Sequence, residues 1–319
     1  MKVYFLVFPE ILLLDLAGIA EAFRIANQNT PTPIFEPLFI GPEKRSPSSI
    51  GLSLAGVSPL PPRIEDDAWI IVCGLPSPEG RIEAGATRDI IGWLRTQVRP
   101  THTVCCVCAG ALIAAEAGLL EGRQCTSHHD HCEWLQKRHP GAQVQSNRIF
   151  VRDGNVYTSA GVTSGIDLAL MLIAEQAGAV IAARVARDLV VYIRRAGHDP
   201  QISVWLAHRN HLHPVVHHAQ DEVVRDPGHS WSLPELAARC HVSVRTLSRL
   251  FRQEAGITPL DYLAQIRLAI ARERLQTTHM SIDRVAESAG FRSALQLRRL
   301  WKKHDEGSPS QLRKRATNA

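Results

Sequence analysis

Apolar residues in the first two-thirds of the chain occur in two patterns, short continuous runs and longer runs with helical period. The continuous runs, which are typical of strands buried on both faces, lie at residues 3–8, 68–73 and 103–107. The helical runs lie at residues 13–26, 89–96, 108–118, 164–177 and 179–195. Strands that alternate with helices in this way predict an open parallel-sheet α/β domain of the flavodoxin-like kind, which binds ligands beyond the carboxyl ends of its strands.

One pair of strands departs from this alternation. Asp153 and Gly154 separate two apolar stretches, residues 148–151 and 155–159. An Asp-Gly pair favours the tight turn of a β-hairpin. We therefore expect these two stretches to form an antiparallel pair of strands. In the sequence this pair follows the strand at 103–107 and precedes the helix at 164–177.

The last ninety residues repeat one pattern at a spacing of fifty. Leu247, Arg249 and Phe251 return as Leu297, Arg299 and Trp301. The repeat extends upstream, where Ser232 and Leu233 match Ser281 and Ile282, and Ser232, Ser243 and Ser293 are suitable N-caps. Each copy predicts a short helix, a tight turn and a second helix, so this part is an all-α domain with two helix-turn-helix motifs.

The second helix of each copy has one apolar face and one polar face. Leu247, Leu250 and Phe251 in the first copy, and Leu297, Leu300 and Trp301 in the second, are predicted to face the core. The predicted DNA-facing positions are Arg245, Ser248, Arg249 and Arg252 in the first copy, and Ala294, Arg298, Arg299 and Lys302 in the second. Arg245 and Arg298 are the expected base contacts. A helix from Pro259 to about Leu275 would hold the two surfaces one turn of DNA apart.

Charge is divided unevenly along the chain. From Gly228 to the end there are 16 Lys and Arg and 8 Asp and Glu, a net charge of +8, whereas the preceding 227 residues carry −3. A solvated helix face normally mixes both signs, but the predicted polar faces carry only positive charge. This distribution favours double-stranded DNA as the partner of the C-terminal domain.

Composition excludes several other classes. The chain has 45% hydrophobic residues, but no apolar run reaches the eighteen residues of a membrane span, and the N-terminus lacks a cleavage pattern. Seven cysteines without a secretory signal indicate reduced thiols in a cytoplasmic protein. Histidines are frequent in residues 205–230, but no cysteine or carboxylate completes a standard ligand set there. We expect no metal and no cofactor.

Cys108 is the candidate reactive residue. It stands where the strand at 103–107 turns into a helix, which would expose the thiol and lower its pKa through the helix N-terminus. His128 begins a run, residues 128–132, interpreted as a polar loop; the alternative is a zinc site, although the spacing repeats no common structural zinc pattern. Cys108, His128 and Asp15 could together supply a nucleophile, a base and a carboxylate.

Both halves resemble known families. Residues 230–315 resemble an AraC/XylS-type DNA-binding domain through Arg267, Ala271 and Leu275 and through residues 289–291, although Glu306 replaces the family's glycine, with Gly307 one place later. The first half resembles the ThiJ/PfpI branch of the glutamine amidotransferase-like superfamily. The residues that carry this match are Asp15, the loop at Gly74, the elbow at 107–110, His128 and residues 158–167.

The whole chain thus resembles a GlxA-type transcriptional regulator. The resemblance implies a ligand-sensing domain at 1–200, a linker and first helix at 201–229, and the DNA-binding domain at 230–315. It implies a small nitrogenous effector near Asp15, Gly74, Cys108, Ala109 and His128, and a homodimer formed through the N-terminal domain. Activation of transcription is expected, with RNA polymerase as a further candidate partner.

Two alternatives remain open for the cysteine. One is a cysteine-dependent hydrolase or hydratase with a DNA-binding tail; the other is a thiol redox sensor. Against hydrolysis, Ala109 stands where a PfpI-like peptidase has histidine, and residues 150–175 contain no His-x-Glu pair of a glutaminase. Catalysis is therefore not expected, and Cys108, His128 and Asp15 are interpreted as vestigial.

Overall fold

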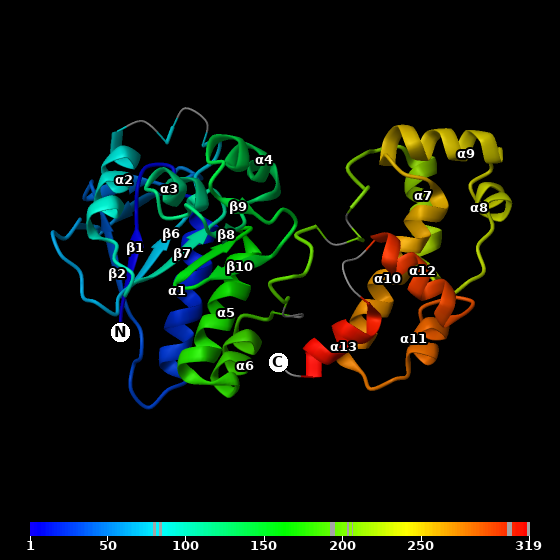
Figure 1. The fold of residues 1–319 in the computed structure, drawn as a ribbon. Coiled ribbons are helices and arrows are strands. Elements are labelled where there is room, and N and C mark those ends of the chain that lie inside the picture. Colours follow the sequence, from blue (N-terminus) through cyan, green and yellow to red (C-terminus); the bar gives the residue numbers. More distant parts are fainter. Residues whose placement is uncertain are drawn as a thin grey trace. The chain divides into compact units, whose positions relative to one another are not determined.

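The computed structural model describes residues 1–78, 81–82, 85–191, 195–202, 204–205, 207–304 and 308–317. These residues form two compact units, Met1–Gln201 and Ile202–Ala319. Figure 1 labels most of the helices and strands. None of the described helices is long and apolar enough to cross a bilayer.

The described part of the first unit is built on a seven-stranded sheet with the order β10-β11-β7-β6-β1-β2-β5. Its strands are β1 (Lys2–Leu6), β2 (Glu36–Gly41), β5 (Ser58–Pro59), β6 (Trp69–Val72), β7 (Thr103–Val107), β10 (Phe150–Asp153) and β11 (Val156–Ser159). All neighbours pair in parallel except β10 and β11, which form the predicted hairpin. The open parallel α/β sheet predicted from the apolar runs is confirmed.

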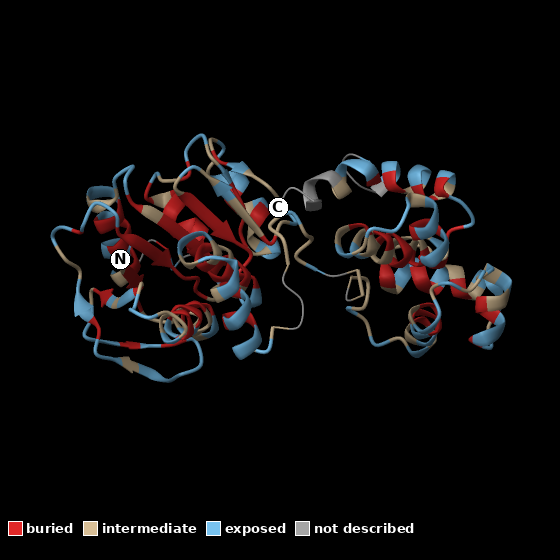
Figure 2. Ribbon diagram, turned by 90° about the horizontal axis from the view of Figure 1, so that it is seen from below, coloured by how far each residue is buried: buried red, intermediate tan, exposed pale blue. Residues whose placement is uncertain are grey.

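Helices cover both faces of this sheet. On one face α1 (Leu13–Gln28), α5 (Thr163–Ala177) and α6 (Ala179–Asp188) pack together, and α2 (Gly85–Gln97) packs with α3 (Gly110–Glu116) on the other (Figure 1). The four central strands consist of buried residues, apart from the first positions of β1 and β7, because helices lie above and below them (Figure 2). The carboxyl ends of β1, β6, β7 and β11 therefore meet at one edge, which is where the candidate ligand site lies.

Several parts of this unit differ from the sequence prediction. The helix expected at 179–195 ends at Asp188, and residues 192–194 lie outside the described residues. The polar run 128–132, interpreted as a loop, instead begins α4 (His129–Arg138). The short strands β3 (Arg45–Pro47), β4 (Ser53–Ala55), β8 (Gln124–Cys125) and β9 (Gln143–Val144) form two small sheets that the apolar pattern did not predict.

The second unit contains the predicted repeat. Its helices are α7 (Pro214–Arg225), α8 (Leu233–Arg239), α9 (Val244–Leu250), α10 (Pro259–Thr277), α11 (Ile282–Ser288), α12 (Ala294–His304) and α13 (Pro309–Thr317), with a π-helical segment, η1 (Phe251–Ala255), after α9. The predicted serine caps are present, because Ser232, Ser243 and Ser293 each accept the backbone N–H three residues later. Glu306 and Gly307, where the sequence departs from the AraC pattern, lie outside the described residues.

Each copy of the repeat has its own core. Leu236, Leu247, Phe251 and Tyr262 are buried in one cluster, and Val285, Leu297 and Trp301 are buried in another. Helix α10 contributes to both clusters, with Ile266 in the first and Ala271 and Leu275 in the second. Its 19 residues span about 28 Å at the rise of an α-helix. The helix thus joins the two helix-turn-helix motifs as a spacer, as the sequence predicted.

Candidate functional site

Cys108 occupies a strained position at the end of β7. Its backbone has φ of 56°, a left-handed conformation that side chains rarely adopt. Two hydrogen bonds fix it there: the Cys108 N–H donates to the Ser159 carbonyl at 3.0 Å, and the Ser127 hydroxyl donates to the Cys108 carbonyl at 2.9 Å. This geometry is that of a nucleophile elbow between a strand and a helix, as the sequence indicated.

Glycines surround the thiol because no larger residue fits. A Cβ on Gly161 would lie 2.2 Å from the Cβ of Cys108 and 2.8 Å from its sulfur, and Gly161 itself has φ of 89°. A Cβ on Gly74 would lie 2.9 Å from the same Cβ. Gly74 follows β6 and Gly161 follows β11, so the ends of three neighbouring strands converge at Cys108.

Asp15 completes this group from α1. Its side chain accepts the Val162 N–H at 2.7 Å and the Gly74 N–H at 3.4 Å, and it forms a hydrogen bond with the Cys108 thiol. Asp15 is only 1% exposed, and burial raises the pKa of its carboxyl above the ordinary value, although those hydrogen bonds oppose the shift. Asp15 and Cys108 therefore form a buried pair of titratable groups.

The expected low pKa of Cys108 is wrong. The residue is 4% exposed, and burial, followed by the negative charge of Asp15, raises the pKa of its thiol to about 12. The Ala109 N–H donates to the sulfur and lowers the pKa, as expected of a helix N-terminus, but by less than burial raises it. At neutral pH the thiol is protonated, so it can donate a hydrogen bond but is a poor nucleophile.

His128 lies at the N-terminus of α4 as its cap. Its Nδ1 accepts the Asp130 N–H at 3.4 Å, and burial, followed by the neighbouring His129, lowers the pKa of its imidazole. Among the described residues, no hydrogen bond joins His128 to Cys108 or to Asp15. The structure thus assembles two members of the hypothetical triad, and the third lies in a separate cluster.

That cluster contains neighbouring imidazoles and a carboxylate. The rings of His128 and His129 lie 4.1 Å apart, and ligand atoms of His128, His129 and Asp130 lie within 4.8 Å of one another. Asp130 pairs with His129 at 3.0 Å and with His128 at 3.4 Å. Asp130 and His129 are exposed, and His128 Nδ1 already accepts the Asp130 N–H, so these contacts are weak. In residues 205–230 the rings of His211 and His217 lie 4.5 Å apart, and His208 Nδ1 and His217 Nε2 contact backbone carbonyls.

Arginines line the exposed side of α9 and η1. We call Arg245, Ser248, Arg249 and Arg252 the first ridge; its three arginines are exposed and Ser248 is half-buried. Arg252 lies in the π-helical segment rather than in a continuous α-helix, and Gly256 ends that segment with φ of 75°. Arg249 is held by a hydrogen bond of 3.1 Å to the Gln253 side chain.

On the matching side of α12, the prediction that Ala294 faces DNA is wrong. Ala294 is 7% exposed and packs in the second core, so it does not lie among the DNA-facing residues. Leu295, which is 75% exposed, takes that place with Arg298, Arg299 and Lys302, and these four residues are the second ridge. The spacing of fifty already indicated this, because Leu295 corresponds to Arg245 and Ala294 corresponds to Val244.

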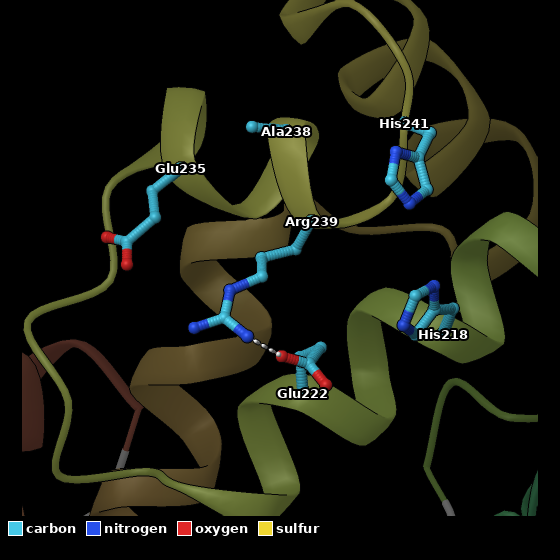
Figure 3. A pocket seen from close by; sticks show the side chains of 6 residues that line it. All are labelled: His218, Glu222, Glu235, Ala238, Arg239 and His241. Atoms are coloured by element: carbon cyan, nitrogen blue, oxygen red, sulfur yellow. Dashed lines mark ion pairs between the residues drawn. The ribbon is translucent and has the colours of Figure 1, made fainter.

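A separate pocket opens between α7 and α8 of the second unit. Six residues line it: His218, Glu222, Glu235, Ala238, Arg239 and His241 (Figure 3). Arg239 Nη1 lies 3.4 Å from a carboxylate oxygen of the buried Glu222, which also pairs with Arg225. These lining residues include none of the two ridges, so the pocket is not part of the predicted DNA contact surface.

Comparison with known proteins identifies both domains. Residues 60–175 match the DJ-1/PfpI family, and residues 236–315 match a helix-turn-helix domain model. The DJ-1/PfpI match is consistent with a solved ThiJ/PfpI family protein from Pseudomonas syringae, which shares the fold at 21% identity and a TM-score of 0.51, covering 75% of this chain and 88% of that one.

Several relatives match both domains, and two of them cover nearly the whole chain. The HTH-type transcriptional regulator CdhR of Pseudomonas aeruginosa is 29% identical over 97% of this chain and 90% of its own. The HTH-type transcriptional regulator GlxA of Rhizobium meliloti is 28% identical over 99% of this chain and 96% of its own. The isonitrile hydratase of Pseudomonas putida matches 56% of this chain and 73% of its own at 30% identity.

The chain is therefore a two-domain protein in which a DJ-1/PfpI domain is followed by an AraC-type helix-turn-helix domain. Along nearly its whole length it matches GlxA-type HTH-type transcriptional regulators.

Proposed function

We propose that this protein is a DNA-binding transcriptional activator whose DJ-1/PfpI domain binds a small nitrogenous metabolite. The observation that carries DNA binding is the duplicated ridge. Arg249 and Arg299 stand fifty residues apart, on helices with the same serine cap and the same buried leucine, and both are exposed. Two such surfaces joined by α10 suit two successive major-groove segments of one promoter.

The proposed effector site is the strand-end group around Cys108. Asp15, Gly74, Cys108 and Ala109 lie in contact there, whereas His128 caps the adjacent α4. The group is small and offers a carboxyl, a thiol and backbone amides. An amine or amino acid fits this chemistry, because its positive nitrogen can pair with Asp15 in a buried setting.

Turnover is not part of the proposal. A thiol with a pKa of about 12 gives little thiolate at neutral pH, and the base candidate His128 is bonded to its own helix. The similarity to isonitrile hydratase favours one second candidate, a cysteine-dependent hydratase that carries a DNA-binding tail. Cys108→Ser separates the two: loss of turnover supports the hydratase, and effector-dependent activation that survives supports the sensor.

Regulation requires that the effector bind one arrangement of the protein better than another. We propose that the DJ-1/PfpI domain also forms a homodimer, which would place two DNA-binding domains on one promoter, and that the bound protein contacts RNA polymerase. A redox sensor is a further alternative for Cys108. It requires an oxidant to change DNA affinity in the natural protein but not in Cys108→Ala.

The experiment that tests the proposal uses the full chain. Genomic fragments that it retains are sequenced, and binding to the recovered site is measured by fluorescence anisotropy with amines and amino acids added one at a time. The proposal predicts nanomolar binding that the double variant Arg249→Ala/Arg299→Ala loses, and at least one amine that changes the affinity. Retention of no sequence above background would contradict it.

A further inference from the structure

The two ridges differ in chemistry at one matching position. Arg245 stands second in α9, and Leu295 stands second in α12. The other three matching positions carry a basic or hydroxyl side chain in both copies. Leu295 is the only apolar residue of either ridge, and 75% of it is exposed.

The fold of α12 does not need this leucine. Among the described side chains of the helix, Ala294, Leu297 and Trp301 are buried, and Leu300 packs against them. Leu295 points away from that cluster, so it stabilises no core of the described unit. It stands instead beside Arg298, Arg299 and Lys302, which are all exposed. The positive charge around it suits a phosphate-bearing partner.

Leucine can recognise one feature of DNA in the major groove. Of the four bases only thymine presents a methyl group there, whereas guanine presents two acceptors that suit arginine. Residues near the N-terminus of a recognition helix contact base edges, and both Arg245 and Leu295 lie in the first turn of their helices.

We propose that Leu295 is a specificity-determining residue that contacts the C5-methyl group of a thymine, while Arg245 gives the first motif a preference for guanine at the matching base pair. The two halves of the DNA site then differ in sequence although the two motifs are copies of one pattern. This inference rests on the proposed DNA-binding function.

The test begins with selection of sites from random duplexes by the full chain. Each thymine of the selected site is then replaced by deoxyuridine, which removes only the methyl group. At one thymine, we expect the replacement to weaken binding about four-fold, the effect of one buried methyl group. Leu295→Ala should weaken binding to the thymine site, and in this variant the same replacement should have no effect.

A matched control and a change of preference complete the test. Leu260, on α10, is 45% exposed and outside both ridges, so Leu260→Ala should keep the full response to deoxyuridine. Leu295→Arg should prefer guanine where the natural protein prefers thymine. If the protein binds DNA specifically, but at no thymine does the effect of removing the methyl group depend on Leu295, the inference about Leu295 is wrong and the proposed function stands. Selection that enriches no sequence would overturn the proposed function and the inference with it.

Discussion

The guanidinium of Arg267 donates a hydrogen bond to the backbone carbonyl of Pro227 at 2.8 Å, and its other end donates to the carbonyl of His229 at 2.6 Å. Arg267 is buried in the middle of α10. A Cβ on Gly290, in the turn of the second motif, would lie 2.9 Å from its Nε. One side chain therefore ties the segment before the first motif, the spacer helix and the second motif together.

Arg267→Ala is expected to loosen this junction. The substitution leaves two carbonyls without their charged donor, and hydrogen bonds of this kind contribute on the order of 1.5–3 kcal/mol each. We predict that local opening of residues 227–230 and 289–291, followed by hydrogen exchange, becomes easier by about 3 kcal/mol. The exposed Arg245→Ala serves as the control and should change the opening free energy by less than about 0.5 kcal/mol. Equal protection in Arg267→Ala and the natural protein would show that the junction does not depend on this arginine.

Comparing alanine substitutions at Gly161 and at Gly178 distinguishes the cost of backbone strain from the cost of crowding against Cys108. They have φ of 89° and 90°, but a Cβ on Gly178 would meet nothing within 4 Å, whereas one on Gly161 would collide with Cys108. Gly178→Ala should cost roughly 1–3 kcal/mol from the backbone alone, because φ of 90° with ψ of 157° is a conformation that is nearly exclusive to glycine. Gly161→Ala should cost roughly 1–3 kcal/mol more because the packed thiol must move. Urea unfolding of both variants measures the difference, and equal losses would mean that the space beside the thiol is larger than the structure indicates.

The thiol of Cys108 is predicted to respond to the charge of Asp15. Because burial and the Asp15 carboxylate raise the pKa of Cys108 to about 12, Asp15→Asn should lower that pKa toward its ordinary value of 9.0. Iodoacetamide should then alkylate Cys108 faster at pH 9 in the variant than in the natural protein. Peptide mapping follows the reaction, with Cys106 of the same strand β7 as the internal control. A rate at Cys108 that stays the same or falls would contradict the electrostatic coupling.

The same shift predicts the direction of a pH effect on stability. A pKa that is higher in the folded state than in the unfolded state means that the folded protein retains the proton. Between pH 9 and about 12, unfolded Cys108 is ionised and folded Cys108 is not. Cys108 therefore makes its full contribution to the free energy of unfolding below pH 9, and this free energy should fall as pH rises from 9 to about 12. Cys108→Ala should show a weaker fall in the free energy of unfolding over the same range.

The sequence predicted the elements whose apolar pattern is continuous. Strand β7 has the predicted limits, and α10 begins at the predicted Pro259 because Thr258 caps it. Strand β2 was missed because Glu36 and Pro37 weaken the apolar run of residues 36–41. The start of α4 was missed because its first residues, from His129 onward, are polar and offer no apolar period.

The sites show where a sequence pattern stops being informative. Helical spacing identified the arginines of both ridges, but it assigned Ala294 to the surface. The repeat spacing of fifty matches Leu295 to Arg245, and the packing of the second core agrees with that match. The pattern around Cys108 predicted the elbow correctly. It did not predict the direction of the pKa shift, because the thiol's burial depends on Asp15, Gly74 and Gly161, which are distant in sequence.

The central claim is that exposed arginines at matching positions of two helix-turn-helix motifs contact one DNA duplex. The most direct test is the salt dependence of binding by the full chain, compared with Arg249→Ala and with Arg299→Ala on the selected site. We predict that each substitution weakens binding and reduces the slope of log affinity against log salt by about one, because one phosphate contact is lost. An unchanged affinity and slope in both variants would contradict the account.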